Sequence, residues 1–313
     1  MLRSVLSLCL LPALALAAPP KVATDITPIH SLVASVMQGV GVPSLLIQSG
    51  ASPHGYTLRP SEAEALQNAE LVFWMSEDLT PWLEGSIASL AKDAVNVKLL
   101  ESEGTLLHDI REGATFEAHD HHDDGDEHGE KHGDNQGHDE HRDPHAWLDP
   151  ENTRTWLNHI AEELARLDPA NAETYRRNAA DTRQQLTDLQ MELEQRVESL
   201  SPVRFIVFHD AYQYFERRFG LIAQGAISIG DASDPSPRRI EKLRNLTESL
   251  NIRCVFTEPQ YNPGLVKSVF APTQVRATPV MDPLGARLEP GTGLYQALIR
   301  DLVRSVEECA KAK

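Results

Sequence analysis

Short apolar runs alternate with longer amphipathic runs along the first half of the chain. The short runs are rich in β-branched residues, which is typical of buried strands, and the longer runs have the spacing of helices. Ser61 and Glu64 have the spacing of a capping box at one helix start. The pattern predicts strands at 21–26, 44–48, 71–75 and 95–100, and helices at 28–38, 60–68 and 82–91.

The same alternation returns in the second half. Strands are predicted at 204–208, 252–257 and 274–280, a helix at 211–219 ended by Gly220, and a last amphipathic helix that carries Leu294, Leu298, Leu302 and Val306. A chain of 313 residues exceeds the usual size of one core. We therefore expect an α/β protein with two lobes, 19–150 and 202–313, each a mostly parallel sheet covered by helices.

Between the lobes, the helical region 151–201 includes one long pattern. Residues 168–201 contain no Gly and a single Pro, Pro169, next to the start. An apolar stripe recurs there at intervals of three and four residues: Tyr175, Ala179, Thr182, Leu186, Leu189, Leu193, Val197 and Leu200. This predicts one helix of about 50 Å that runs along both lobes as a strut. The alternative is an ordinary lobe helix followed by a loop.

The first residues have the order of a secretory signal peptide. Arg3 precedes an apolar run at 5–16 and the small residues Ala15, Ala17 and Ala18. We expect residues 1–18 to be removed by cleavage near Ala17/Ala18. The apolar run is shorter than the roughly 20 residues that span a bilayer. No later stretch is long and apolar enough, so a secreted, soluble mature protein without membrane insertion is expected.

Charge and cysteine content narrow the function further. A net charge of −17 excludes nucleic acid as a natural partner, although acidity often serves solubility alone. Once the signal peptide is removed, Cys254 and Cys309 remain, and an oxidising compartment favours their pairing. Such a bridge would stabilise the fold by about 4 kcal/mol. A thiolate metal site is the weaker alternative, because no third Cys or nearby His accompanies either residue.

Residues 119–141 hold seven His and nine Asp or Glu and almost nothing apolar. No core can form there, so a disordered loop is expected within about 108–142. A solvated charge run is the ordinary interpretation, but it would not need imidazoles. Imidazoles among carboxylates predict several weak, exchangeable sites for divalent metal ions. The expected ligands are His119, His121, His122, His128, His132, His138 and His141.

A tight site needs ligands on a rigid scaffold, and four candidates stand beside predicted element ends. These are His54, His145, His209 and Asp282. In open α/β sheets, ligands gather at the carboxyl ends of the strands, and three imidazoles with one carboxylate suit Zn²⁺. Each candidate also has an ordinary interpretation that involves no metal. A loop His is usually a surface or hydrogen-bonding group, and the Asp of an Asp-Pro pair is usually a turn former.

Five segments together carry a specific resemblance. They are GASPHGYTLRPSEAEALQNAELVFW, PHAWLDPENTRTW, FHDAYQYFERRFGL, CVFTEPQYNPGLVKSV and MDPLG, with the His-rich loop between the first two. In this order they resemble the zinc-binding, ZnuA-type members of the cluster A-I solute-binding proteins. The resemblance implies two Rossmann-like lobes, a rigid backbone helix and a metal site in the cleft. It implies a periplasmic monomer that captures Zn²⁺ with high affinity and delivers it to an inner-membrane ABC permease.

The resemblance places His54 and His145 on the first lobe, and His209 with Asp282 on the second. Manganese-binding relatives tend to carry Glu at the position of His209, so the resemblance favours zinc. Some zinc members carry a Glu before the first ligand, where this chain has Pro53. The fourth ligand is therefore Asp282 or water. The resemblance also implies the Cys254–Cys309 bridge.

Three other functions compete with zinc transport. A zinc hydrolase would need a general base beside the metal. The chain contains no HExxH, GxSxG or GxxxxGK[ST] motif, and HGEKH has the wrong spacing, so we expect no enzyme. A manganese or iron uptake protein on the same scaffold is the second rival. A surface adhesin or structural protein with an incidental metal site is the third.

Overall fold

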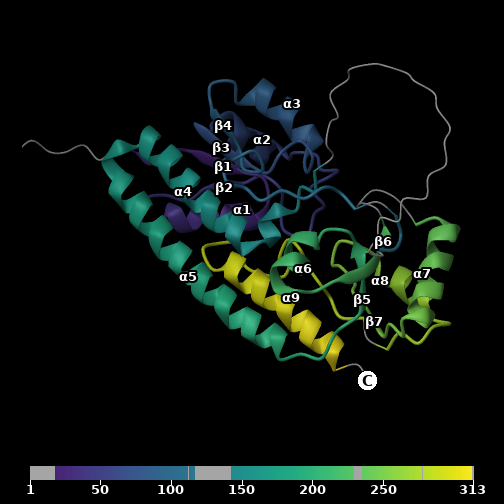
Figure 1. The fold of residues 1–313 in the computed structure, drawn as a ribbon. Coiled ribbons are helices and arrows are strands. Elements are labelled where there is room, and N and C mark those ends of the chain that lie inside the picture. Colours follow the sequence, from purple (N-terminus) through teal and green to yellow (C-terminus); the bar gives the residue numbers. More distant parts are fainter. Residues whose placement is uncertain (1–17, 112, 117–141, 229–234, 277, 312–313) are drawn as a thin grey trace, which may run out of the picture.

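The architecture was obtained as a computed structural model that describes residues 18–311 except 112, 117–141, 229–234 and 277 (Figure 1). The predicted signal peptide and the loop histidines at 119–141 therefore lie outside the described residues. Two α/β lobes lie on a layer of long helices. None of the described helices combines the length and the apolar character needed to cross a bilayer.

The first lobe is built on a parallel sheet with strand order β2-β1-β3-β4. Its strands are β1 (Val22–Thr24), β2 (Ser44–Leu45), β3 (Leu71–Trp74) and β4 (Val95–Lys98). Its helices are α1 (Thr27–Val36), α2 (Pro60–Gln67) and α3 (Pro81–Leu90). Alternate residues of β3 belong to different clusters: Phe73 packs in the cluster that holds α1, and Trp74 packs in the cluster that holds α2 and α3. The sheet is thus buried on both faces, as parallel sheets require.

The second lobe repeats this plan with strand order β6-β5-β7, again parallel. Its strands are β5 (Phe205–His209), β6 (Ala223–Ser228) and β7 (Cys254–Val255). Its helices are α6 (Gln213–Phe219), α7 (Pro237–Ser249) and α8 (Pro263–Phe270). Gly220 ends α6 in the left-handed conformation, as predicted. The predicted strand 274–280 is reduced to one parallel bridge between Thr257 and Val280.

Long helices join the lobes. They are α4 (Pro150–Leu167), α5 (Ala172–Glu198) and α9 (Leu294–Ala310), with short 3₁₀ turns η1 (Ala146–Leu148) and η2 (Pro169–Asn171). The 27 residues of α5 span about 40 Å. α5 packs on α1 of the first lobe, on α6 of the second, and on α4 and α9 (Figure 1). One hydrophobic cluster runs from α1 through α4 and α5 to β5 and α9, so the two lobes share a core.

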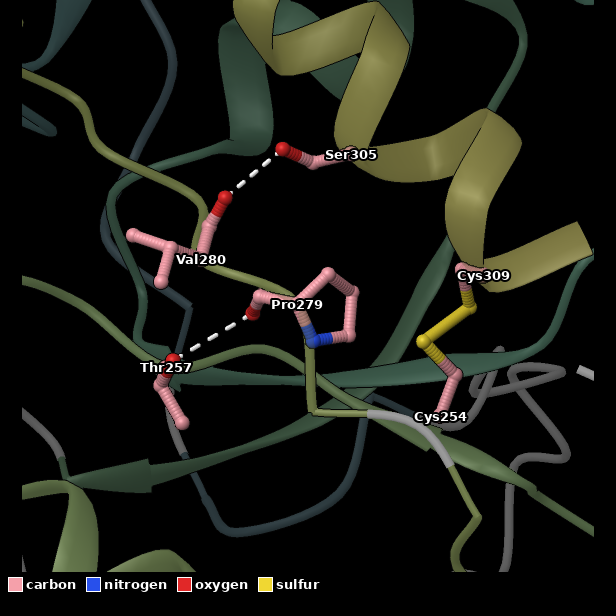
Figure 2. Close-up of a disulfide and its surroundings, with 6 residues drawn as sticks. All are labelled: Cys254, Thr257, Pro279, Val280, Ser305 and Cys309. Atoms are coloured by element: carbon pink, nitrogen blue, oxygen red, sulfur yellow. Dashed lines mark hydrogen bonds between the residues drawn. A yellow bond between two sulfur atoms is a disulfide. The ribbon is translucent and has the colours of Figure 1, made fainter.

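A disulfide ties the second sheet to the last helix. Cys254 on β7 is bonded to Cys309 near the end of α9, which confirms the predicted pairing (Figure 2). Nearby, the Ser305 hydroxyl on α9 donates to the Val280 carbonyl at 2.7 Å. Since both cysteines are consumed in this bridge, the alternative of a thiolate metal site is excluded.

One segment of the first half crosses to the second lobe. Thr115 forms an antiparallel bridge with Gly225 on β6, and the Phe116 amide donates to the Gln224 carbonyl at 3.0 Å. A side chain at Gly225 would collide with the Ala114 carbonyl oxygen, so glycine is needed for this close approach. The segment that leads toward residues 117–141 is therefore fixed to the second sheet.

Candidate metal-binding site

The predicted histidines meet at a small cavity between the lobes. It is lined by Pro53, His54, His145, Trp147, His209, Glu258, Gln260, Tyr261, Pro283 and Leu284. The volume of this cavity is about 10 Å³. That is room for a single water or ion. The cavity therefore suits an ion rather than an organic ligand.

The imidazole ring of His145 lies close to those of both other histidines in this cavity. The His54 and His145 ring centroids lie 5.9 Å apart, and those of His145 and His209 lie 5.4 Å apart. Three imidazoles on one Zn²⁺ at a Zn–N distance of about 2.0 Å have centroids roughly 5 Å apart. Within the described part of the chain, no group of three or more His, Cys, Asp or Glu is already arranged to hold a metal. Coordination by all three rings therefore requires a rearrangement, in which the centroids of the two measured pairs would draw together by less than about 1 Å.

His145 is held by a carboxylate two residues before it. It stands directly before η1, and its backbone N–H donates to Asp143 Oδ1 at 3.0 Å. Its ring Nδ1 lies 2.7 Å from the same oxygen, and both side chains are buried. An ionised carboxylate can only accept, so Nδ1 carries the hydrogen. The Nε2 lone pair is then directed away from Asp143 and is available to a metal.

His209 is held in the same way by a residue from the neighbouring strand. β5 and β7 pair with Phe205 opposite Cys254 and Ile206 opposite Val255. The same offset brings Glu258 beside His209, the last residue of β5. The Glu258 carboxylate accepts from the His209 amide at 3.2 Å and from ring Nδ1 at 2.8 Å. The sheet register thus selects the tautomer whose Nε2 can bind a metal.

His54 comes from the turn that follows β2 and is only partly buried. The preceding residue, Pro53, is anchored because its carbonyl accepts from Trp82 Nε1 of α3 at 2.8 Å. The structure thus brings the first-lobe ligand candidate to the cavity on a turn, whereas His145 and His209 stand at the ends of regular elements.

Asp282 does not line this cavity. Its carboxylate accepts three backbone hydrogen bonds, from Leu284 at 3.1 Å, Gly285 at 3.0 Å and Ala286 at 2.6 Å. The residue therefore acts as the turn former that its Asp-Pro sequence also allowed. The turn places Pro283 and Leu284 in the cavity wall.

Several hydrogen bonds close the cavity across the lobes. Trp147 Nε1 donates to the Pro283 carbonyl at 2.8 Å, and Gln213 Nε2 on α6 donates to Asp143 Oδ2 at 3.2 Å. Within the second lobe, the Tyr212 hydroxyl donates to the Met281 carbonyl at 2.9 Å. Burial, with the nearby Glu258 carboxylate, raises the pKa of Tyr212 well above its usual value, so it stays protonated as a donor. These bonds fix the positions of the walls.

A cluster of charged side chains includes Asp210, the residue after His209. Arg111 pairs with both Asp210 and Glu216, and its guanidinium lies 3.9 Å from the centre of the Phe116 ring. Burial alone would lower the pKa of Arg111, but the two carboxylates outweigh it and raise that pKa. Burial raises the pKa of Asp210, and the Arg111 charge partly opposes this shift. The cluster ties the segment before residue 117 to the residue that follows His209.

Sequence patterns did not single out Asp143, Glu258 or Gln260 as site residues. The spacing of Asp143 and His145 in DPH could have indicated a local carboxylate–imidazole pair. Glu258 could be found only through the β5–β7 register, which the sequence does not specify.

The fold and the site together define a two-lobed α/β protein with three histidines at a small cavity between its lobes. A family model described as "Zinc-uptake complex component A periplasmic" matches residues 22–309. The high-affinity zinc uptake system protein ZnuA of Brucella abortus (strain 2308) is 42% identical over 304 residues, covering 92% of this chain and 91% of that protein. The chain belongs to this ZnuA family.

Two further comparisons agree with that assignment. The protein of the same description from Paracoccus denitrificans (strain Pd 1222) is 39% identical over 314 residues, covering 94% of this chain and 92% of that protein. A crystal structure of ZnuA superposes with a TM-score of 0.74 at 25% identity, covering 94% of this chain and 99% of that chain. Both the sequence and the fold therefore match along nearly the whole described chain.

Proposed function

We propose that this protein captures Zn²⁺ in the periplasm and delivers it to an ABC-type permease of the inner membrane. The zinc ion is held between the lobes by Nε2 of His54, His145 and His209. The observation that carries this proposal is the convergence of three imidazoles, distant along the chain, on one ion-sized cavity. Membership of a family of periplasmic zinc-uptake components supports it. The proposal includes no catalytic step.

The ligand set favours zinc over the harder manganese ion. Imidazole nitrogen suits Zn²⁺, whereas Mn²⁺ prefers carboxylate, carbonyl and water oxygens. Among the described residues that line the cavity, Glu258 is the one carboxylate, and it is already bonded to His209. The alternative of a manganese or iron carrier is tested by titrating Mn²⁺ against Zn²⁺, and we expect zinc to displace manganese completely.

The fourth position on the zinc ion belongs to Asp282 or to water. For Asp282 to bind the ion, its carboxylate would have to give up hydrogen bonds to the backbone of 284–286. Water needs no such change. We therefore favour water, with Asp282 retained as a turn former.

The remaining parts of the proposal rest on sequence alone. The histidines at 119–141 gather zinc weakly, the signal peptide is cleaved near Ala17/Ala18, and the mature protein acts as a monomer. Deleting 119–141 is expected to remove weak zinc sites while sparing the tight one.

Zinc titration of the purified mature protein tests the assignment. His209→Ala should weaken tight binding by more than about 100-fold, because loss of a direct ligand exceeds the usual effect of its supporting groups. His159→Ala is the matched control, since this histidine lies on α4 and bonds to the Glu103 carbonyl. Tight binding that survives in the His209 variant, or is lost equally in the control, would reject the proposed site.

A further inference from the structure

Gln260 lines the cavity two residues after Glu258. A hydrogen bond orients its side-chain amide, because Nε2 donates to Asp282 Oδ1 at 3.4 Å. A carboxylate oxygen accepts only from the NH₂ group, so the amide oxygen is directed elsewhere. Gln260 therefore offers Oε1 rather than Nε2 to its remaining surroundings.

That oxygen is buried and finds no hydrogen-bond donor among the residues described between 18 and 311. A buried acceptor without a donor costs roughly 1–3 kcal/mol, and such groups are uncommon in native proteins. The three neighbouring imidazoles use carboxylates for two of their Nδ1 hydrogens, so His145 and His209 do not supply a donor through that atom. The missing donor is best supplied by what the cavity binds.

We propose that Gln260 Oε1 accepts a hydrogen bond from the water that completes the zinc shell, making Gln260 a positioning residue for the fourth ligand. This inference rests on the proposed zinc function and specifies its fourth position. An amide oxygen is a poor direct ligand for Zn²⁺, which takes nitrogen, sulfur and carboxylate oxygen. A zinc-bound water, in contrast, is a strong donor because the cation polarises it.

The same residue connects the ion to the turn at Asp282. Its Nε2 reaches the carboxylate that holds 284–286, while Oε1 faces the bound water in our proposal. Asp282 thus influences the fourth position through Gln260, without touching the metal.

Two variants separate the roles of the oxygen and the amide hydrogen. Gln260→Met keeps the length but removes both, whereas Gln260→Glu keeps an oxygen acceptor and removes the NH₂ group. Zinc affinity is measured by competition with a chelator, and the shell is examined by the visible absorption of the Co²⁺-loaded protein. His209→Ala and wild type are measured beside them.

Gln260→Met should bind zinc about 10- to 100-fold more weakly than wild type, the usual effect of losing an outer partner of a metal site. Its Co²⁺ spectrum should change, whereas the melting temperature of its zinc-free form should not fall, because an unpaired buried acceptor has been removed. Gln260→Glu should stay within tenfold of wild type, because it restores the acceptor.

Wild-type affinity and an unchanged Co²⁺ spectrum in Gln260→Met would overturn the inference. Equal losses in the Met and Glu variants would overturn it too, because the oxygen would then be irrelevant. If wild type lacks tight zinc binding, or His209→Ala retains it, the proposed function itself fails, and the two failures are thereby distinguished.

Discussion

At the residue scale, two of the three imidazoles that line the cavity owe their direction to a carboxylate. Asp143 and Glu258 each bond both the backbone N–H and the ring Nδ1 of their histidine. Two bonds to one residue fix the side chain relative to the backbone, so the ring has little rotational freedom left. The binding geometry of His145 and His209 is therefore prepared before an ion arrives.

Replacing either carboxylate by its amide should weaken zinc binding without removing a ligand. Asp143→Asn and Glu258→Gln keep the shape but lose the charge that strengthens the bond to Nδ1–H. We expect a loss of about 10- to 100-fold in zinc affinity for each variant, measured by chelator competition. Asp188→Asn, on α5 and bonded to Gln184, serves as the control. Unchanged affinity in both variants would show that the carboxylates do not orient the ligands.

Asp25, which directly follows β1, makes stability depend on pH. Its buried carboxyl accepts from the Ile26 and Met75 amides, and burial raises its pKa to about 7. The unfolded chain binds this proton only below about pH 4. Between pH 4 and 7 the folded state holds the extra proton, so stability falls as pH rises, by up to about 1.4 kcal/mol per pH unit.

Urea unfolding of zinc-free protein between pH 5 and 8 checks this expectation. Asp25→Asn removes the titrating group, so the free energy of unfolding of the variant should depend less on pH than that of wild type. The stability of the variant relative to wild type should be higher at pH 8 than at pH 5. Parallel pH profiles for the two proteins would contradict the assignment.

The candidate ligands could be predicted because each histidine stands in a short, distinctive segment next to an element end. His54, His145 and His209 all reach the cavity. Asp282 was chosen by the same rule, but the strand expected before it is only one bridge. Local sequence cannot show whether an Asp carboxylate turns inward or accepts the amides of its own turn. The supporting Glu258 depends on strand register, a non-local property.

At the element scale, apolar periodicity located the strands and helices that pack most deeply. β3 and α9 were found because their buried residues dominate their composition. The pattern missed β6, α7 and α8. β6 contains a glycine and polar residues, and α7 is mostly polar with a narrow apolar stripe that includes Leu243 and Leu246. α2 begins at Pro60 as predicted, but its capping pair differs, since Glu62 rather than Glu64 accepts from the backbone at the cap.

The bridge between β7 and α9 should contribute about 4 kcal/mol to stability, because it closes a loop with a sequence separation of 55. Replacing Cys254 and Cys309 together by Ala should lower the free energy of unfolding by that amount in urea titrations. Zinc affinity should not change, because neither residue lines the metal cavity. Reduction of wild type provides a matched measurement. A loss below about 1 kcal/mol would contradict the expected role of the bridge.

At the scale of the whole molecule, the strut predicted at 168–201 is a single helix, slightly shorter than expected. Asp168 caps α4, η2 follows it, and α5 spans Ala172–Glu198. Tyr175 still packs at its start, with its hydroxyl donating to Asp168 at 2.9 Å. The helix nevertheless contacts both lobes, and their shared core leaves little freedom for opening. Arg218 on α6 adds a bond to Asp149 at 2.7 Å, at the start of α4.

A rigid frame explains how three histidines from separate elements can form one site. The first lobe presents His54, the connection into α4 presents His145, and the second sheet presents His209. In the proposed capture, small movements of side chains in the cavity would suffice, without large closure of the lobes.

Anomalous X-ray scattering at the zinc edge, from crystals of the zinc-loaded mature protein, tests this account most directly. We predict one strong zinc peak in the interlobe cavity, with Nε2 of His54, His145 and His209 each about 2.0–2.1 Å from it. A zinc ion bound elsewhere, or one that fewer than two of these imidazoles contact, would contradict the account.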